Sequence, residues 1–225
     1  MMLENLNIRQ ATFNDIEFVI EAIIEADKSG TQMISTCNVF SLSTDEYKNI
    51  LNDLLRQDIE NYDYYLSGFF IAELNGESIG TSGSWLEGGG GKPSGVVKGE
   101  VLFSYLDRSK LSNIKNNIQI ISGSNLPREI GALQLEYVYI RKDYRGKGIF
   151  SQIVSKNIKR NLDKYSFSKV QSILFKANHK SYSAFLKLGY EIIQENKSSN
   201  PEILKFFPYD TKVIMELNQD KFSKF

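Results

Sequence analysis

The sequence lacks the features of a disulfide-rich or metal-binding protein. Its 225 residues include a single cysteine, Cys37, so no disulfide can form within the chain. A lone cysteine without a nearby histidine is more often a small buried side chain than a nucleophile. No cluster of histidine, cysteine and carboxylate residues has the spacing of a zinc site, so we expect no metal.

The chain also lacks an excess charge and a long hydrophobic run. Its 27 basic and 27 acidic residues leave a net charge of zero, which excludes an overall attraction to nucleic acid or to an anionic membrane. No apolar stretch approaches membrane-spanning length, and the first ten residues do not resemble a secretory signal. We therefore expect a cytoplasmic protein with neither nucleic acid nor membrane as a partner.

Hydrophobic periodicity predicts a mixed α/β chain. Thr12 and Asp15 have the spacing of a capping box, and Ser43 or Thr44 could begin a second helix. The dipeptide Asn75-Gly76 is a strong hairpin signal. The expected strands cover residues 6–11, 66–74, 78–84, the run that ends at Ile140, 170–176 and 211–217.

One stretch does not fit this pattern of helices and strands. Residues 88–95 are too rich in glycine to form a regular element, and they predict a mobile loop. Residues 96–121 contain segments compatible with either strand or helix, and the pattern assigns neither. We interpret residues 86–130 as an insertion in a single domain that spans residues 1–225.

The most informative segment is LQLEYVYIRKDYRGKGIF, residues 133–150. It predicts a strand, a basic turn with Gly146 and Gly148, and a helix that begins at the glycines. The free N–H groups of the first helical turn, with Arg145 and Lys147 beside them, are typical of an anion site. The spacing fits neither a Walker loop nor a dinucleotide fingerprint, and an ordinary strand–turn–helix connection would also explain it.

A second segment, NHKSYSAFLKLGY from Asn178, narrows these choices. Together the two segments resemble the GNAT family of acyl-CoA-dependent N-acetyltransferases, whose patterns are Q/R-x-x-G-x-G/A and N-x-x-A-x-x-x-Y-x-x-x-G-F. The residues that match are Gly146, Gly148, Asn178, Gly189 and Tyr190, while Ser181 is a mild change. Asp143 replaces the usual glutamine or arginine, and Phe185 replaces the tyrosine.

The resemblance implies a fold, a donor and a cofactor site. The fold would be a mixed, mostly antiparallel central sheet flanked by helices, with the insertion before its central strand. Acetyl-CoA would be the acyl donor. Its pyrophosphate would lie on N–H groups of Arg145, Gly146, Lys147, Gly148, Ile149 and Phe150, and its pantetheine arm along Val138, Tyr139 and Ile140, with Asn178 contacting the arm. Asn178 could equally be a helix cap, and the two roles are compatible.

The resemblance also suggests catalytic residues. Glu136, the one acidic residue within an apolar and aromatic strand, is our candidate base, although it could simply face solvent. Water relayed by Tyr137 or Tyr139 is the alternative. Because Phe185 lacks a hydroxyl, Tyr182, one helical turn earlier, is our candidate acid, with aromatic packing as the other explanation of this residue.

The acceptor would be a primary amine of a small molecule or a protein, acetylated directly in a ternary complex. The only histidine, His179, we interpret as a solvated residue at a helix start. The acidic run from Asp53 to Asp63 could attract a cationic amine or could be a solvated face. A non-catalytic acyl-CoA sensor or assembly module remains the alternative function, and a homodimer is compatible with the sequence.

Overall fold

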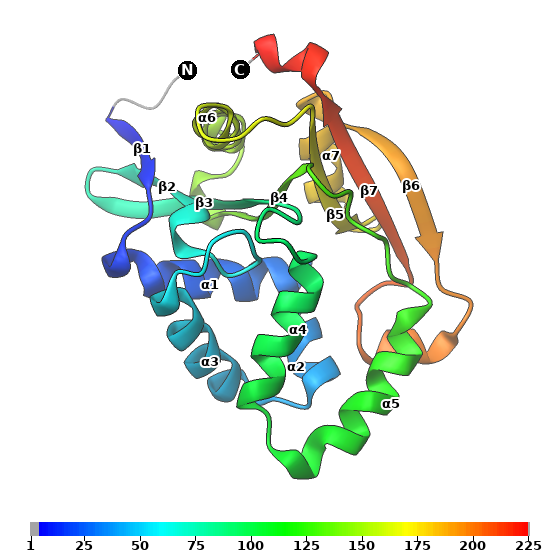
Figure 1. Ribbon diagram of the computed structural model, residues 1–225. Helices are drawn as coiled ribbons and strands as arrows, with labels where there is room; N and C mark the ends of the chain where they lie inside the picture. The colour runs from blue at the N-terminus through cyan, green and yellow to red at the C-terminus, as the bar shows by residue number, and fades with distance from the viewer. Residues whose placement is uncertain (1–4, 225) are drawn as a thin grey trace.

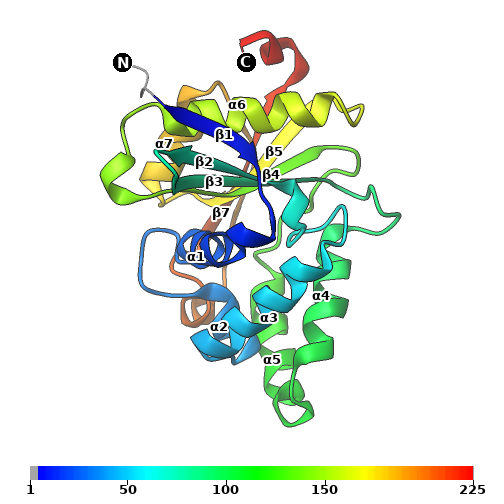
Figure 2. The ribbon, with the colours of Figure 1, turned by 90° about the vertical axis from the view of Figure 1, so that its left-hand side faces the viewer.

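A seven-stranded sheet separates two helical layers in the computed structural model, which describes residues 5–224 (Figures 1 and 2). The strand order is β1-β2-β3-β4-β5-β7-β6, and only the β4–β5 pair is parallel. The strands are β1 (Leu6–Gln10), β2 (Phe69–Leu74), β3 (Glu77–Leu86), β4 (Leu133–Ile140), β5 (Lys169–Phe175), β6 (Glu191–Lys197) and β7 (Thr211–Asn218). This is the mixed, mostly antiparallel sheet that the sequence predicts.

The helices lie on both faces of the sheet. They are α1 (Ile16–Asp27), α2 (Ser35–Phe40), α3 (Thr44–Gln57), α4 (Ser94–Tyr105), α5 (Leu111–Ser122), α6 (Ile149–Leu162) and α7 (His179–Lys187). Helices α6 and α7 cover one face and α1 to α5 the other (Figure 2). The expected capping box of Thr12 and Asp15 is confirmed, and Ser43, rather than Thr44, caps α3, where it forms a second capping box with Glu46.

Separate hydrophobic cores fill the two layers. On the α6 face, Leu133, Leu135 and Val213 pack against the buried stripe of α6. On the α1 face, Tyr137 and Tyr139 of the same strand β4 pack with α1 and α3. Strand β4 therefore contributes to both cores, and it lies at the centre of the sheet.

The segment that the sequence left unassigned is helical. Residues 96–121 fall within α4 and α5, joined by a short 3₁₀ turn, Arg108–Lys110. Leu102 of α4 and Ile114 of α5 are fully buried, and residues 87–93 form turns before α4. The spacing of apolar residues alone could not identify α4, because Gly95 and Gly99 interrupt its apolar pattern and its N-cap position is Pro93.

Two other elements differ from the prediction. Residues Leu66–Gly68 form a 3₁₀ turn rather than the beginning of β2. Strand β6 was not predicted, because it lies at the edge of the sheet with nearly all of its side chains exposed and so has no alternation of buried and exposed residues.

Candidate functional site

The connection from β4 to α6, residues 141–148, forms a turn with an open backbone, here called the glycine turn. Gly146 and Gly148 both have φ +77°, a conformation that side chains with a Cβ rarely adopt. A Cβ built on Gly146 would meet no atom within 4 Å. The glycines are therefore required by the backbone conformation rather than by crowding within the protein, and a ligand can approach this turn closely.

The glycine turn presents N–H groups and positive charge to solvent. The N–H of Arg145 donates to the carbonyl of Lys142 at 3.3 Å, whereas the first N–H groups of α6 have no acceptor within the helix. The guanidinium of Arg145 donates through Nε to the carbonyl of Ile140 at 2.8 Å. The ammonium of Lys147 lies 5.2 Å from the ring centre of Tyr144. Both cations thus stay beside the start of a 14-residue helix, where an anion is favoured.

Strands β4 and β5 separate next to this turn. They pair only at Leu133 with Val170 and at Gln134 with Gln171. Beyond Gln134, β4 keeps its partner β3 while β5 keeps its partner β7. Val138, Tyr139 and Ile140 therefore lie on the part of β4 that has lost its neighbour, where an extended ligand can add to the strand edge.

A β-bulge in β4 changes which side chains face the α1 layer. The register against β3 shifts between Thr81 and Gly83, and Tyr137 has φ +53°, which is rare for an aromatic residue. Glu136 and Tyr137 are consecutive, yet both reach the ionisable groups of the α1 layer. The bulge thus places two polar side chains together on one face.

Glu136 belongs to a group of charged and polar residues, here called the charge cluster: Asp63, Lys98, Arg128, Glu136 and Tyr137. Arg128 donates to Oε1 of Glu136 at 2.8 Å, and its other terminal nitrogen lies 3.8 Å from Asp63. The guanidinium also stacks on Trp85, 5.1 Å from the ring centre. Within residues 5–224, Oε2 of Glu136 has no hydrogen-bond partner, and it is free to accept one.

Asp63 is the buried centre of the charge cluster. Its side chain is 1% exposed, accepts a 2.8 Å bond from Lys98, and lies 3.3 Å from the hydroxyl of Tyr137. Burial alone would raise the pKa of Asp63, but the charges of Lys98 and Arg128 outweigh it and hold this pKa below its ordinary value. Asp63 is therefore an ionised carboxylate in the protein interior rather than part of a solvated face.

The nearby tyrosines stay protonated. Burial raises the pKa of Tyr137 and of Tyr64 well above 10, and the hydroxyl of Tyr64 lies 3.1 Å from that of Tyr47. Burial, with a 3.0 Å bond from its hydroxyl to Glu21, raises the pKa of Tyr139 to about 12. These hydroxyls can relay a proton through a hydrogen-bond chain, but they do not supply a phenolate near neutral pH.

Asn178 caps α7, as expected, by accepting from the N–H of Ser181 at 3.5 Å. It also lies beside Gly30, whose added Cβ would be 3.7 Å from Oδ1 of Asn178. Phe185 is buried and makes edge-on contacts with Phe150 and Tyr190, at 5.3 and 5.0 Å between ring centres. Tyr182 packs half-buried against the same core.

The sequence pointed to residues on one side of the candidate site, and it missed most of the charge cluster. The predicted residues on β4, in the glycine turn and at the start of α7 surround the opening between β4 and β5. Lys98 and Arg128 were not predicted, because they lie in the unassigned insertion. Asp63 was noticed only as one member of an acidic run, and its neighbours Tyr62 and Tyr64 are also buried.

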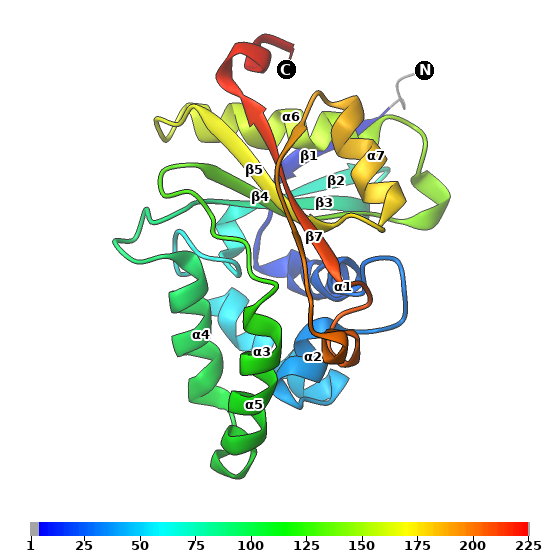
Figure 3. The ribbon, with the colours of Figure 1, turned by 90° about the vertical axis from the view of Figure 1, so that its right-hand side faces the viewer.

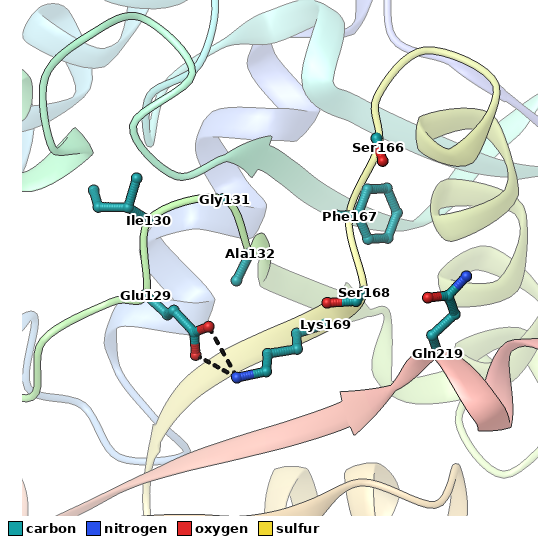
Figure 4. Close-up of a pocket in the computed structure, with 9 residues that line it drawn as sticks. All are labelled: Glu129, Ile130, Gly131, Ala132, Ser166, Phe167, Ser168, Lys169 and Gln219. Carbon is teal, nitrogen blue, oxygen red and sulfur yellow. Dashed lines mark hydrogen bonds and ion pairs between the residues drawn. The ribbon is translucent and has the colours of Figure 1, made fainter.

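Two hollows lie outside the charge cluster. One, of about 300 Å³, lies between residues 129–132, residues 166–169 and Gln219, at the opposite end of β4 from the glycine turn (Figure 4). It contains the ion pair of Glu129 with Lys169 and none of the predicted site residues. The other, about 480 Å³ and open, includes Ala177, His179, Tyr209 and Thr211 beside the start of α7.

The expectations about Cys37 and His179 fit the structure. Cys37 is buried, and burial raises the pKa of its thiol to about 11, which disfavours a nucleophilic thiolate. His179 is exposed at the first position of α7. Among residues 5–224, no group of three or more potential ligands could hold a metal ion. No helix in this part of the chain is long and apolar enough to cross a membrane.

Comparison with protein families gives one match. The model of the acetyltransferase (GNAT) family matches residues 36–190, more than half of the 225 residues. This range includes α3, the insertion, the glycine turn and α7. No curated protein is similar enough in sequence to count as a match.

Many solved structures share the fold. An N-acetyltransferase from Staphylococcus aureus Mu50 is 13% identical, with a TM-score of 0.62 over 94% of this chain and 100% of that one. A putative acetyltransferase, yncA, from Salmonella typhimurium with its cofactor acetyl-CoA is 16% identical, with a TM-score of 0.52 over 96% and 95%. An aminoglycoside acetyltransferase in complex with coenzyme A and kanamycin is 13% identical, with a TM-score of 0.53 over 97% and 98%.

Proposed function

Because the chain belongs to the acetyltransferase (GNAT) family, we propose that it transfers the acetyl group of acetyl-CoA to a primary amine of a small molecule or protein. Transfer is direct, in a ternary complex of enzyme, donor and acceptor. The observation that carries this proposal is the separation of β4 from β5 beyond Gln134, between the glycine turn and Glu136. Along β4 and the turn that follows it, this opening is lined by an anion site, a free strand edge and a carboxylate.

The residues at this opening fit the donor. The N–H groups of Gly146 to Phe150 would hold the pyrophosphate, with Arg145 and Lys147 adding charge. The free edge of Val138, Tyr139 and Ile140 would pair with the amide groups of the pantetheine arm. Oδ1 of Asn178 is used by the helix cap, so its Nδ2 can donate to the arm.

Glu136 would prepare the acceptor. A primary amine with a pKa near 10 is neutral in only about one molecule in a thousand at pH 7, so the proton must have a destination. Oε2 of Glu136 can accept a bond from the ammonium while Arg128 holds Oε1 in place. The proton leaves to Glu136 directly or through an ordered water.

The transfer step needs an oxyanion donor and a leaving group. The neutral amine forms a bond to the acetyl carbon while the carbon–sulfur bond breaks, and an N–H group of residues 138–140 would stabilise the developing oxyanion. The sulfur leaves as a thiolate, and the nitrogen gives up its extra proton to that thiolate or to solvent. Because a thiol has a pKa near ~8.5, it can leave unaided or receive a proton from Tyr182.

The experiment is an acceptor-dependent thiol-release assay with acetyl-CoA, with the products examined by mass spectrometry. The acceptors are aminoglycosides, polyamines, amino acids, and peptides with a free N-terminus or lysine. We expect thiol release that depends on an amine and matches the amount of N-acetylated product. Thiol release without acetylated amine would show thioester hydrolysis and contradict the proposal.

The second candidate function is a non-catalytic acyl-CoA sensor or assembly module. The replacement of the family's tyrosine by Phe185, packed between Phe150 and Tyr190, favours it. Binding of acetyl-CoA in calorimetry, without turnover of any amine in the panel, would support this function instead.

A further inference from the structure

A lysine on β7, Lys212, projects into the α1 layer near the charge cluster. Its neighbour Val213 packs in the core on the α6 face, so Lys212 points to the opposite face of the sheet. In register it lies opposite Phe175 of β5, the strand that separates from β4. In Figure 3, β7 lies beside β5, and α2 and α5 lie below the sheet.

The ammonium of Lys212 is held by aromatic rings rather than by an acid. Its Nζ lies 3.7 Å from the ring centre of Phe207 and 5.4 Å from that of Phe175. No carboxylate within residues 5–224 lies within ion-pair distance of it, and no described hydrogen bond uses its three donors. The rings attract the cation, but they accept no hydrogen bond from it, so its three N–H donors are open to a ligand or to water.

The two acids that act most on Lys212, Glu136 and Asp27, already have other hydrogen-bond partners. Burial lowers the pKa of Lys212 to about 8, while Glu136 and Asp27 raise it and Arg128 and Lys98 lower it. Glu136 pairs with Arg128, and Asp27 accepts the backbone N–H of Thr36 at 2.9 Å. Burial also raises the pKa of Asp27, which favours its neutral form. Arg128 neutralises Glu136 and Lys98 neutralises Asp63, so Lys212 is a cation without a counterion among the described residues.

We propose that Lys212 binds a carboxylate of the acceptor, so that the substrates of this chain are amines that also carry a carboxylate. The inference rests on the proposed function and names the substrate class of the same site. A single unpaired ammonium matches one negative charge, which a carboxylate supplies. With the carboxylate on Lys212, the amine can reach Oε2 of Glu136, because both groups face the α1 layer on either side of the opening between β4 and β5.

The test compares acceptors that differ only in the carboxylate. The pairs are phenylalanine with phenethylamine, β-alanine with ethylamine, and 5-aminopentanoate with butylamine, which also vary the spacing between the two groups. The readout is the ratio of kcat/KM within each pair for the wild type, Lys212→Met and Lys212→Arg. Lys197→Met, on the exposed neighbouring strand, is the matched control.

For at least one spacing we expect the wild type to prefer the carboxylated member. Lys212→Met should reduce this preference about 10- to 100-fold, the value of one charged hydrogen bond, mainly through KM. Lys212→Arg should restore much of it, and Lys197→Met should leave it unchanged. Between pH 7 and 9 the preference should decline in the wild type but not in Lys212→Arg, which keeps its charge.

Four results would overturn the inference. Equal turnover of both members of every pair, or a preference for the uncarboxylated amines, would contradict it while leaving the proposed function intact. A Lys212→Met variant that loses kcat equally for both members would make Lys212 a proton acceptor or a packing residue. No turnover of any of these six amines by a protein that acetylates another amine of the acceptor panel would contradict the inference alone, whereas no turnover of any amine by a folded protein that binds acetyl-CoA would contradict the proposed function, and this inference with it.

Discussion

The glycine turn follows strand β4 and the charge cluster includes two residues of that strand, but the two regions are built in different ways. The glycine turn is contiguous in sequence and exposed, and its important groups belong to the backbone. The charge cluster is assembled from the loop after α3, from α4, from the loop before β4, and from β4 itself. A cofactor common to a family can be bound by a short repeated motif, whereas the acceptor side depends on how distant segments pack.

The largest expected effect concerns Glu136. Replacing it by glutamine keeps the bond from Arg128 but removes the proton acceptor, so turnover should fall by ~10² to 10⁴. The affinity for coenzyme A should hardly change, because the glycine turn is unaltered. Steady-state kinetics and calorimetry measure the two quantities separately.

Glu129→Gln is the matched control, since Glu129 pairs with Lys169 at the opposite end of β4. It should have little effect on turnover. Wild-type turnover in Glu136→Gln over the whole pH range would assign the removal of the proton to a chain of waters and tyrosine hydroxyls that leads to another acceptor.

The second effect is on stability and separates the two regions further. Asp63→Asn leaves Lys98 and part of Arg128 without a buried counter-charge, and breaking such a pair costs about 3–5 kcal/mol of unfolding free energy. Because the folded-state pKa of Asp63 is lowered, its stabilising contribution is present above pH ~4 and is lost as the pH falls through that lowered value. Denaturant unfolding at pH 7 and pH 3 measures this loss.

The exposed Asp143 of the glycine turn provides the control. Asp143→Asn should change the unfolding free energy by less than about 0.5 kcal/mol. If Asp63→Asn were equally harmless, the charge cluster would not stabilise the fold. The charge cluster and the glycine turn would then differ less than we argue.

A third prediction tests the glycine turn itself. Gly146→Val places a branched side chain where we expect phosphate, and it also disfavours the observed φ. The affinity for coenzyme A should fall at least about tenfold, or ~1.4 kcal/mol. Gly91→Val is a close control, because Gly91 has φ +83° and equally open surroundings but lies in the turns before α4. It should carry the same backbone strain and leave calorimetric affinity unchanged; equal losses in both variants would mean that strain alone explains the result.

These two regions also show how far the sequence predicts the structure. Most strands, the capping box of Thr12 before α1, the caps of α3 and α7, and the glycine turn follow from local patterns, because each depends on neighbouring residues. Arg128 could not be predicted, since its partners Glu136 and Asp63 are brought to it only by packing of the insertion. The bulge at Tyr137 has no local signal either, because tyrosine normally favours a regular strand.

The smallest effect is expected at Tyr182. If it protonates the departing thiolate, Tyr182→Phe should slow turnover, but only several-fold, because a thiolate leaves readily without an acid. Phe185→Tyr should then restore part of the rate in the double variant. Full activity of Tyr182→Phe in steady-state kinetics would leave Tyr182 a packing residue of the α6 core.

The most direct measurement of the central claim is amide hydrogen exchange with and without coenzyme A. We predict new protection at residues 138–140, on the free edge of β4, and at residues 146–150, where the glycine turn leads into α6. We predict little change at residues 129–132 and 166–169 around the hollow of Figure 4. Protection that appears around this hollow while residues 138–150 exchange as before would place the cofactor at the wrong end of β4 for our account and contradict it.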